Sequence, residues 1–202
     1  MDFLNDIWCF FVKHDEMVRG YLLILVAGFG LRLTFRRLAL ADANHLADTY
    51  TRAIDQIGQN DQVVRLGGLY ALGELAHKNK DYHWKIMKVL CAFVRENASP
   101  IGGHPLPITI QAALTIIAER RIDFDRQQDT KNNTTIDLSK SCLQGAHLEK
   151  ADLDDADVSY ADLRESNITQ EQFYSAITNK DTIPPLGIKN PDASPDPSPS
   201  SE

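Results

Sequence analysis

The sequence contains only three cysteines, Cys9, Cys91 and Cys142, and none of them lies at a zinc-binding spacing from a histidine. This scattered, odd set excludes a disulfide framework, and we expect three reduced thiols. No glycine-rich phosphate loop follows an expected strand, and the six histidines show no metal-ligand or nucleophile–base pattern. These absences predict that the chain is not an enzyme and needs no cofactor.

Clustered basic residues are also scarce. The 202 residues carry 21 Lys and Arg against 28 Asp and Glu, which gives a net charge of −7. This balance argues against a broad nucleic-acid-binding surface. A hydrophobic content of 43% suffices for one or two small domains. We therefore expect an unidentified protein as partner, no nucleic acid, and a homo-oligomer as an open alternative.

Long apolar runs are lacking too, because the longest one covers only residues 21–31 (YLLILVAGFGL). About 20 residues are needed to span a bilayer. Widening the window to 17–35 adds Arg19 and Arg32 near its ends, where arginines can reach the headgroups. The hypothesis is a single transmembrane helix in contact with a lipid bilayer, with these membrane residues: Tyr21, Leu22, Leu23, Ile24, Leu25, Val26, Phe29 and Leu31. A buried core helix and a cleaved signal peptide are the alternatives.

Four regions follow one another along the chain. Residues 1–41 form an N-terminal segment that contains the expected membrane helix, and residues 42–127 form an α-helical module. Residues 134–183 hold a repeat and its closing helix, and residues 187–202 form a Pro- and Ser-rich tail that we predict to be disordered. The module is expected to contain consecutive amphipathic helices that are similar to HEAT-like repeats.

Two details of the helical module lead to further expectations. Asn60 or Asp61 is expected to cap a helix that begins at Gln62, and Asp81 to cap the next helix. The helix from Gln62 contains three glycines, Gly67, Gly68 and Gly73. Since each glycine costs about 1 kcal/mol in a helix interior, their grouping predicts that another backbone packs closely against this helix.

From residue 138 onward an apolar residue returns every five positions. This period fits neither a helix, whose period is 3.6 residues, nor a simple strand, whose period is two. A small residue precedes most of the apolar ones by two positions, and Asp or Asn commonly stands between them. The predicted core consists of Leu138, Leu143, Leu148, Leu153, Val158, Leu163, Ile168, Phe173, Ala146, Ala151, Ala156 and Ala161.

This pattern is typical of pentapeptide repeats, A(D/N)LXX, in which each unit forms one side of a square coil. It predicts a short right-handed quadrilateral β-helix of about two coils, a solenoid closed by a helix whose capping box is Thr169 and Gln172. The last two positions of each unit should face water. The candidate acidic interaction face comprises Asp154, Asp155, Glu149 and Glu165.

Several segments resemble a family of bacterial membrane-associated pentapeptide-repeat proteins. They are RAIDQIG, VRLGGLYALGELA, HWKIMKVLCAFVREN and NITQEQFYSAITNKDTIPP, and the likeness covers roughly residues 20–186. It implies a short transmembrane helix, a helical module and then the repeats, with no catalytic chemistry. Arg32 departs from the apolar span of that family.

These observations favour a non-enzymatic, membrane-tethered scaffold protein. Three cationic residues follow the apolar run and two precede it, which would place the C-terminal domain in the cytoplasm of a single-pass bacterial inner-membrane protein. Two alternatives are a soluble DNA mimic with a topoisomerase-type target and a membrane-damaging effector that oligomerises through its N-terminal helix.

Overall fold

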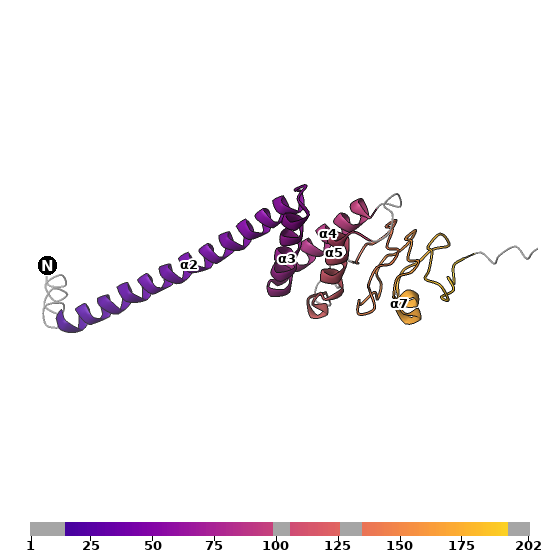
Figure 1. Ribbon diagram of the computed structural model, residues 1–202. Helices are drawn as coiled ribbons and strands as arrows, with labels where there is room; N and C mark the ends of the chain where they lie inside the picture. The colour runs from indigo at the N-terminus through magenta and orange to yellow at the C-terminus, as the bar shows by residue number, and fades with distance from the viewer. Residues whose placement is uncertain (1–14, 99–105, 126–134, 194–202) are drawn as a thin grey trace, which may run out of the picture. The chain divides into compact units, whose positions relative to one another are not determined.

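The computed structural model describes residues 15–98, 106–125 and 135–193 (Figure 1). By its internal contacts the chain divides into two compact units, Met1–Asp48 and Thr49–Glu202. Its helices are α2 (Asp15–Ile57), α3 (Gln62–Lys78), α4 (Lys80–Asn97), α5 (Ile108–Ala118) and α7 (Gln170–Ser175). Helices α3 to α5 form the helical module. The repeat region follows them, and we use this name for residues 135–193.

The first unit contains most of α2, which is a single helix of 43 residues. Its apolar side chains are 59–70% exposed at each predicted membrane position except Leu22, whose side chain lies outside the described residues. Among the residues that the structure describes, no helix is long and apolar enough to cross a membrane. The predicted transmembrane helix and inner-membrane localisation are therefore wrong.

The composition of α2 explains this correction. At 1.5 Å per residue, eleven apolar residues extend about 16 Å, whereas the hydrocarbon core of a bilayer is about 30 Å thick. Any window that extends beyond residues 20–31 takes in Arg19 or Arg32. The helix continues well beyond its apolar run because residues 38–57 contain five alanines and three leucines, which are strong helix formers, among polar residues.

In the second unit, α3, α4 and α5 pack against one another. Each helix contributes an apolar stripe to a shared core, where the following side chains are at most 2% exposed: Leu69, Leu72, Ile86, Met87, Leu90, Ile110, Leu114 and Ile117. Burying one such side chain stabilises the fold by about 1.5–3 kcal/mol. This core holds the helical module together.

Local capping decides where two of these helices begin. Asp61 caps α3, since its Oδ1 accepts hydrogen bonds from the N–H groups of Val63 (2.8 Å) and Val64 (3.3 Å). The predicted cap at Asp81 is wrong, because Asn79 accepts from the N–H groups of Asp81 and Tyr82. Asp81 lies instead in the first turn of α4, where the helix dipole favours a negative charge.

The three glycines of α3 have different surroundings. A Cβ on Gly68 would lie 2.8 Å from the carbonyl oxygen of Ala53, so the backbone of α2 passes close to this position. A Cβ on Gly73 would lie 3.0 Å from the Ile116 side chain, and one on Gly67 would meet nothing within 4 Å. Close backbone packing therefore occurs at one of the three glycines.

The repeat region turns every five residues and contains no strand among its described residues, so the prediction of a β-helical solenoid is wrong. Four isolated parallel bridges occur instead, between Asp137 and Asp157, Cys142 and Asp162, Asp157 and Ile177, and Asp162 and Ile183. A turn every five residues leaves only about three residues between turns, which is too short for a continuous ladder. The bridges still give successive turns of the chain a register of about twenty residues.

The interior of the repeat region is apolar. All twelve residues that the period assigns to the core are at most 6% exposed. Helix α7 follows, and both bonds of its capping box are present: Gln172 N donates to Thr169 Oγ1 (3.2 Å), and Thr169 N donates to Gln172 Oε1 (2.8 Å). The predicted capping box is thus confirmed.

The described chain continues past the expected end of the folded part. Asn190 Nδ2 donates to the carbonyl oxygens of Asn179 (2.7 Å) and Thr182 (2.9 Å), and Thr178 Oγ1 donates to Asp192 Oδ2 (2.8 Å). Residues 187–193 are therefore bonded to the last turn of the repeat region. The remainder of the predicted tail, 194–202, lies outside the described residues.

Candidate interaction surface

The turns of the repeat region share two recurring features, a positive φ at the fifth residue and a hydrogen bond to an aspartate at the second. The fifth residue of a unit has a positive φ at Lys140 (59°), Gly145 (72°), Asp155 (56°), Tyr160 (62°) and Glu165 (58°). The aspartate at the second position fixes the turn, since its carboxylate accepts a hydrogen bond from the backbone N–H two residues later. This bond occurs at 2.9–3.2 Å in Asp137, Asp152, Asp157 and Asp162.

The four residues of the expected acidic face come from three units of the repeat. Asp154 and Asp155 belong to unit 151–155 and Glu149 to unit 146–150, whereas Glu165 belongs to the unit that pairs with residues 141–145. All four side chains are exposed, but they occupy three different units of the twenty-residue turn. Basic residues also stand between them in the sequence, among them the exposed Lys150 and Arg164. This arrangement does not favour the DNA-mimic alternative, which needs a continuous acidic face.

Helix α7 adds new neighbours to Asp154 and Asp155. It follows residues 151–155 by twenty positions, and the N–H of Asp155 donates to the carbonyl oxygen of Ser175 (3.0 Å). Glu171 and Tyr174, three positions apart on this helix, are exposed, and the Tyr174 side chain is 50% exposed. We call Asp154, Asp155, Glu171 and Tyr174 the Asp154–Tyr174 surface.

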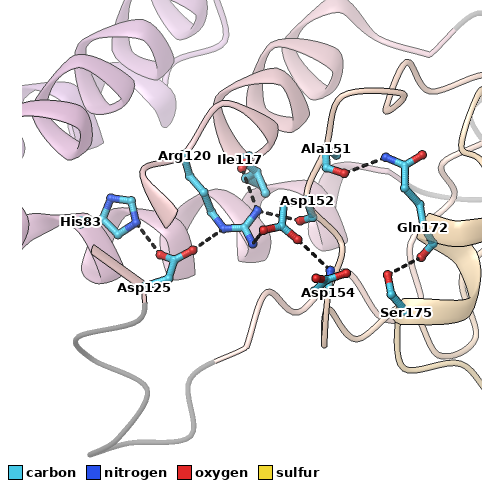
Figure 2. Close-up of polar contacts among 9 residues, drawn as sticks. All are labelled: His83, Ile117, Arg120, Asp125, Ala151, Asp152, Asp154, Gln172 and Ser175. Atoms are coloured by element: carbon cyan, nitrogen blue, oxygen red, sulfur yellow. Dashed lines mark hydrogen bonds and ion pairs between the residues drawn. The ribbon is translucent and has the colours of Figure 1, made fainter. Parts of the chain in front are cut away.

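Gln172 fixes α7 against the turn that precedes this surface (Figure 2). Its Nε2 donates to the carbonyl oxygens of Ala151 (2.7 Å) and Leu148 (2.8 Å). The Ser175 hydroxyl donates to the Gln172 carbonyl oxygen (3.2 Å) at the end of the helix. Phe173, 1% exposed, anchors the same helix in the core. The short helix is thus held by one amide and one aromatic ring.

A chain of polar contacts connects the helical module to the turn that carries Asp154 and Asp155 (Figure 2). His83 of α4 is buried, and its Nε2 lies 2.8 Å from Asp125 Oδ1. Arg120, which follows α5, donates from Nε to Asp125 Oδ2 (2.7 Å) and from Nη1 to the carbonyl oxygen of Asp152 (2.8 Å). Asp152 Oδ1 then accepts from the N–H of Asp154 (3.0 Å). The chain therefore supports the turn that presents Asp154 and Asp155.

Further bonds join the module to the first turn of the repeat. The side-chain amide of Gln111, on α5, accepts from the N–H of His147 and donates to its carbonyl oxygen, both at 3.0 Å. The N–H of Cys142 donates to the carbonyl oxygen of Ala98 (3.0 Å), and Arg95 forms an ion pair with Asp137. His147 stands where most other units have Asp or Asn, and the Gln111 side-chain amide binds the backbone of His147.

A cleft of about 420 Å³ opens between α3, α4 and α5 and includes His83 and Arg120 in its lining. Three of the charged or titratable groups in its walls, Glu74, His83 and Arg120, already have partners. Glu74 pairs with Lys78 (2.5 Å), and the hydrogen bond from this lysine lowers the pKa of the Glu74 carboxyl. His83 and Arg120 share Asp125. We therefore assign no reaction to the cleft.

The thiol and metal chemistry of the described residues is limited. Burial raises the pKa of the Cys91 thiol to about 12, so this thiol is protonated at neutral pH and is a poor nucleophile. Across the described ranges, no group of three His, Cys, Asp or Glu side chains could hold a metal ion. Cys9 lies outside the described residues.

Some residues that form or support this surface had no direct sequence indication. Arg120 and Asp125 bind partners 32 and 42 positions away, a separation that local spacing does not reveal. Glu171 and Tyr174 could have been assigned, because the capping box predicts their helix and a twenty-residue turn places it beside Asp155.

Comparison with known proteins identifies one part of the chain. Residues 136–170 match the family described as Pentapeptide repeats, in eight copies. No curated protein and no solved structure matches the chain. The match confirms the repeat that the five-residue period predicts, whereas the resemblance of the helical segments to bacterial membrane-associated proteins stays a prediction.

Proposed function

We propose that this chain, with eight pentapeptide repeats in residues 136–170, is a non-enzymatic protein that binds a protein partner through the Asp154–Tyr174 surface. Pentapeptide repeats are generally protein-interaction modules, and this repeat is the observation that carries the proposal. Its apolar positions are buried, and the last two positions of unit 151–155 are exposed. The side chains of that surface are thus available to a partner without cost to the core.

The composition of the surface indicates the chemistry of the partner. The surface contains three carboxylates and one half-exposed tyrosine, Tyr174. Tyrosine is enriched among the residues that contribute most to binding, and carboxylates attract a basic surface and raise its association rate. We therefore propose a basic protein segment as the partner.

The support behind the surface favours binding as well. Arg120 and Asp152 hold the turn of Asp154 and Asp155, and Gln172 holds α7. A surface that is already ordered loses less conformational entropy when it binds. This proposal includes no membrane tether.

The test compares two double variants of the full chain. Partners are first identified by cross-linking to the full chain, and the dissociation constant is then measured with both proteins purified. D154K/D155K should weaken binding at least tenfold, about 1.4 kcal/mol or more. The control E149K/E165K makes the same charge change on two other units, and it should alter the dissociation constant by less than about threefold.

Two outcomes would contradict the proposal. Equal weakening by both double variants would show a response to net charge alone. Unchanged binding in D154K/D155K would place the partner on another surface. Far-UV circular dichroism of each variant checks that the fold is retained.

A further inference from the structure

The repeat region ends in a segment that the proposed function does not use. Residues 176–185 form the last coil of the repeat, and side-chain hydrogen bonds tie residues 187–193, which we call the strap, to that coil. Unpaired backbone groups at the edge of a β-structure can pair with another chain, and natural proteins cover such edges or place proline there. We propose that the strap and Pro184 close the edge of the last coil, and so keep a second copy of the repeat region from pairing with it end to end.

The edge of the last coil lies on either side of Ile183. The N–H of Ile183 donates to the carbonyl oxygen of Ala161 (2.9 Å), and the carbonyl oxygen of Ile183 accepts from the N–H of Leu163 (2.8 Å). One coil earlier, Asp162 bonds in the same way to the residues on either side of Cys142. Both backbone groups of Ile183 therefore face the preceding coil. A further chain would bond to the carbonyl oxygen of the residue before Ile183 and to the N–H of the residue after it.

Neither of these two flanking groups is available for pairing. The carbonyl oxygen of Thr182 accepts from Asn190 Nδ2 (2.9 Å). Residue 184 is a proline, which has no N–H to donate. The same Asn190 amide donates to the carbonyl oxygen of Asn179 (2.7 Å), so the strap binds two carbonyl oxygens of the last coil. The edge at Ile183 thus lacks its donor, and its acceptor is already bonded.

The opposite end of the repeat region is closed by the helical module. The N–H of Cys142 donates to the carbonyl oxygen of Ala98 (3.0 Å), just as the N–H of Asp162 donates to the carbonyl oxygen of Ser141 (3.0 Å). Ala98, which follows α4, thus takes the place that a preceding coil would have. End-to-end pairing with a second copy is therefore left to the last coil, where the strap lies.

Site-specific photocrosslinking in the full chain tests this closure. A photoreactive phenylalanine derivative replaces Ile177, which belongs to the last coil and is 47% exposed. P184A/N190A supplies the missing N–H and frees the carbonyl oxygen of Thr182, and it should raise the yield of a crosslinked species of twice 22.6 kDa at least about tenfold. The control N190A frees the same carbonyl oxygen but supplies no N–H, and it should raise that yield less than about threefold. P184A/N190D is a second double variant with the same expected increase, because aspartate has the shape of asparagine but no amide donor.

Three outcomes would overturn the proposal. An equal yield in the wild-type background and in P184A/N190A would mean that the strap closes nothing. An equal yield in N190A and in P184A/N190A would mean that the N–H at residue 184 has no part in the closure. Absence of the crosslinked species in both double variants, with the far-UV circular dichroism of the wild type retained, would mean that the edge does not pair with a second copy. Association through α2 would be the same in all four chains and would produce no difference between them.

Discussion

Replacing Arg120 by methionine should destabilise the second unit far more than the loss of a solvent-exposed ion pair would. The Arg120 side chain is only 5% exposed and donates three hydrogen bonds, to Asp125, to the carbonyl oxygen of Ile117 and to that of Asp152. Methionine fills a similar volume but leaves the Asp125 carboxylate, 15% exposed, without its arginine. Breaking a buried pair in this way costs roughly 3–5 kcal/mol.

Arg164 provides a matched control for this substitution. It pairs with Asp162 at 2.6 Å, but its side chain is 56% exposed, so Arg164→Met should cost no more than about 1 kcal/mol. Urea unfolding at pH 7 and 25 °C, followed by circular dichroism, gives the free energy of unfolding for both variants. The double variant R120M/D125N should recover part of the loss, because it no longer buries an unpaired charge.

The outcome that would refute this reasoning is equal stability of the two single variants. In that case the contacts of Arg120 with Asp125 and Asp152 would contribute no more than a solvent-exposed ion pair. A substitution at Arg120 that lowers stability should also weaken partner binding, since Arg120 supports the turn that presents Asp154. The dissociation constant for the partner measures this second effect.

Three further predictions concern single positions in the second unit. Gly67→Ala should stabilise the fold by about 0.5–1 kcal/mol in urea unfolding, because a glycine inside a helix costs conformational entropy. Gly68→Ala should destabilise it by about 1–3 kcal/mol in the same assay, because the new Cβ would clash with the backbone of α2. Asp155→Gly should raise the free energy of unfolding by about 1 kcal/mol, because φ is 56° there, while Asp154→Gly should lower it; equal effects would contradict the turn geometry. Cys91 should resist a thiol reagent at pH 8 until urea unfolds the chain. The free energy of unfolding should fall as the pH rises from about 8.5 toward about 12, because the thiol of the unfolded chain loses its proton at a lower pH than the buried thiol does.

The sequence predicted those features that depend on local spacing. The five-residue period identified the repeat, and the capping box of α7 followed from Thr169 and Gln172. The N-cap of α4 was misassigned to Asp81, because Asn79 and Asp81 are both good capping residues. Only the extended backbone of Asn79 distinguishes the two. Local patterns thus predicted elements better than boundaries.

Features that depend on distant partners were not predictable in this way. The bonds from Arg120 to Asp152 and from Gln111 to His147 join residues more than thirty positions apart. The neighbours of an acidic residue were not predictable either, because shared charge does not imply a shared unit. The twenty-residue register, and not the number of acidic residues, decides which side chains are neighbours.

Site-specific photocrosslinking tests the central claim most directly. A photoreactive phenylalanine derivative is placed at Tyr174 in one chain and at Tyr160 in another; both tyrosines are about half exposed, at 50% and 54%, and they lie in different units. The Asp154–Tyr174 surface predicts that position 174 crosslinks to the basic partner and that position 160 does not. Crosslinking at position 160 alone, or equally at both positions, would contradict it.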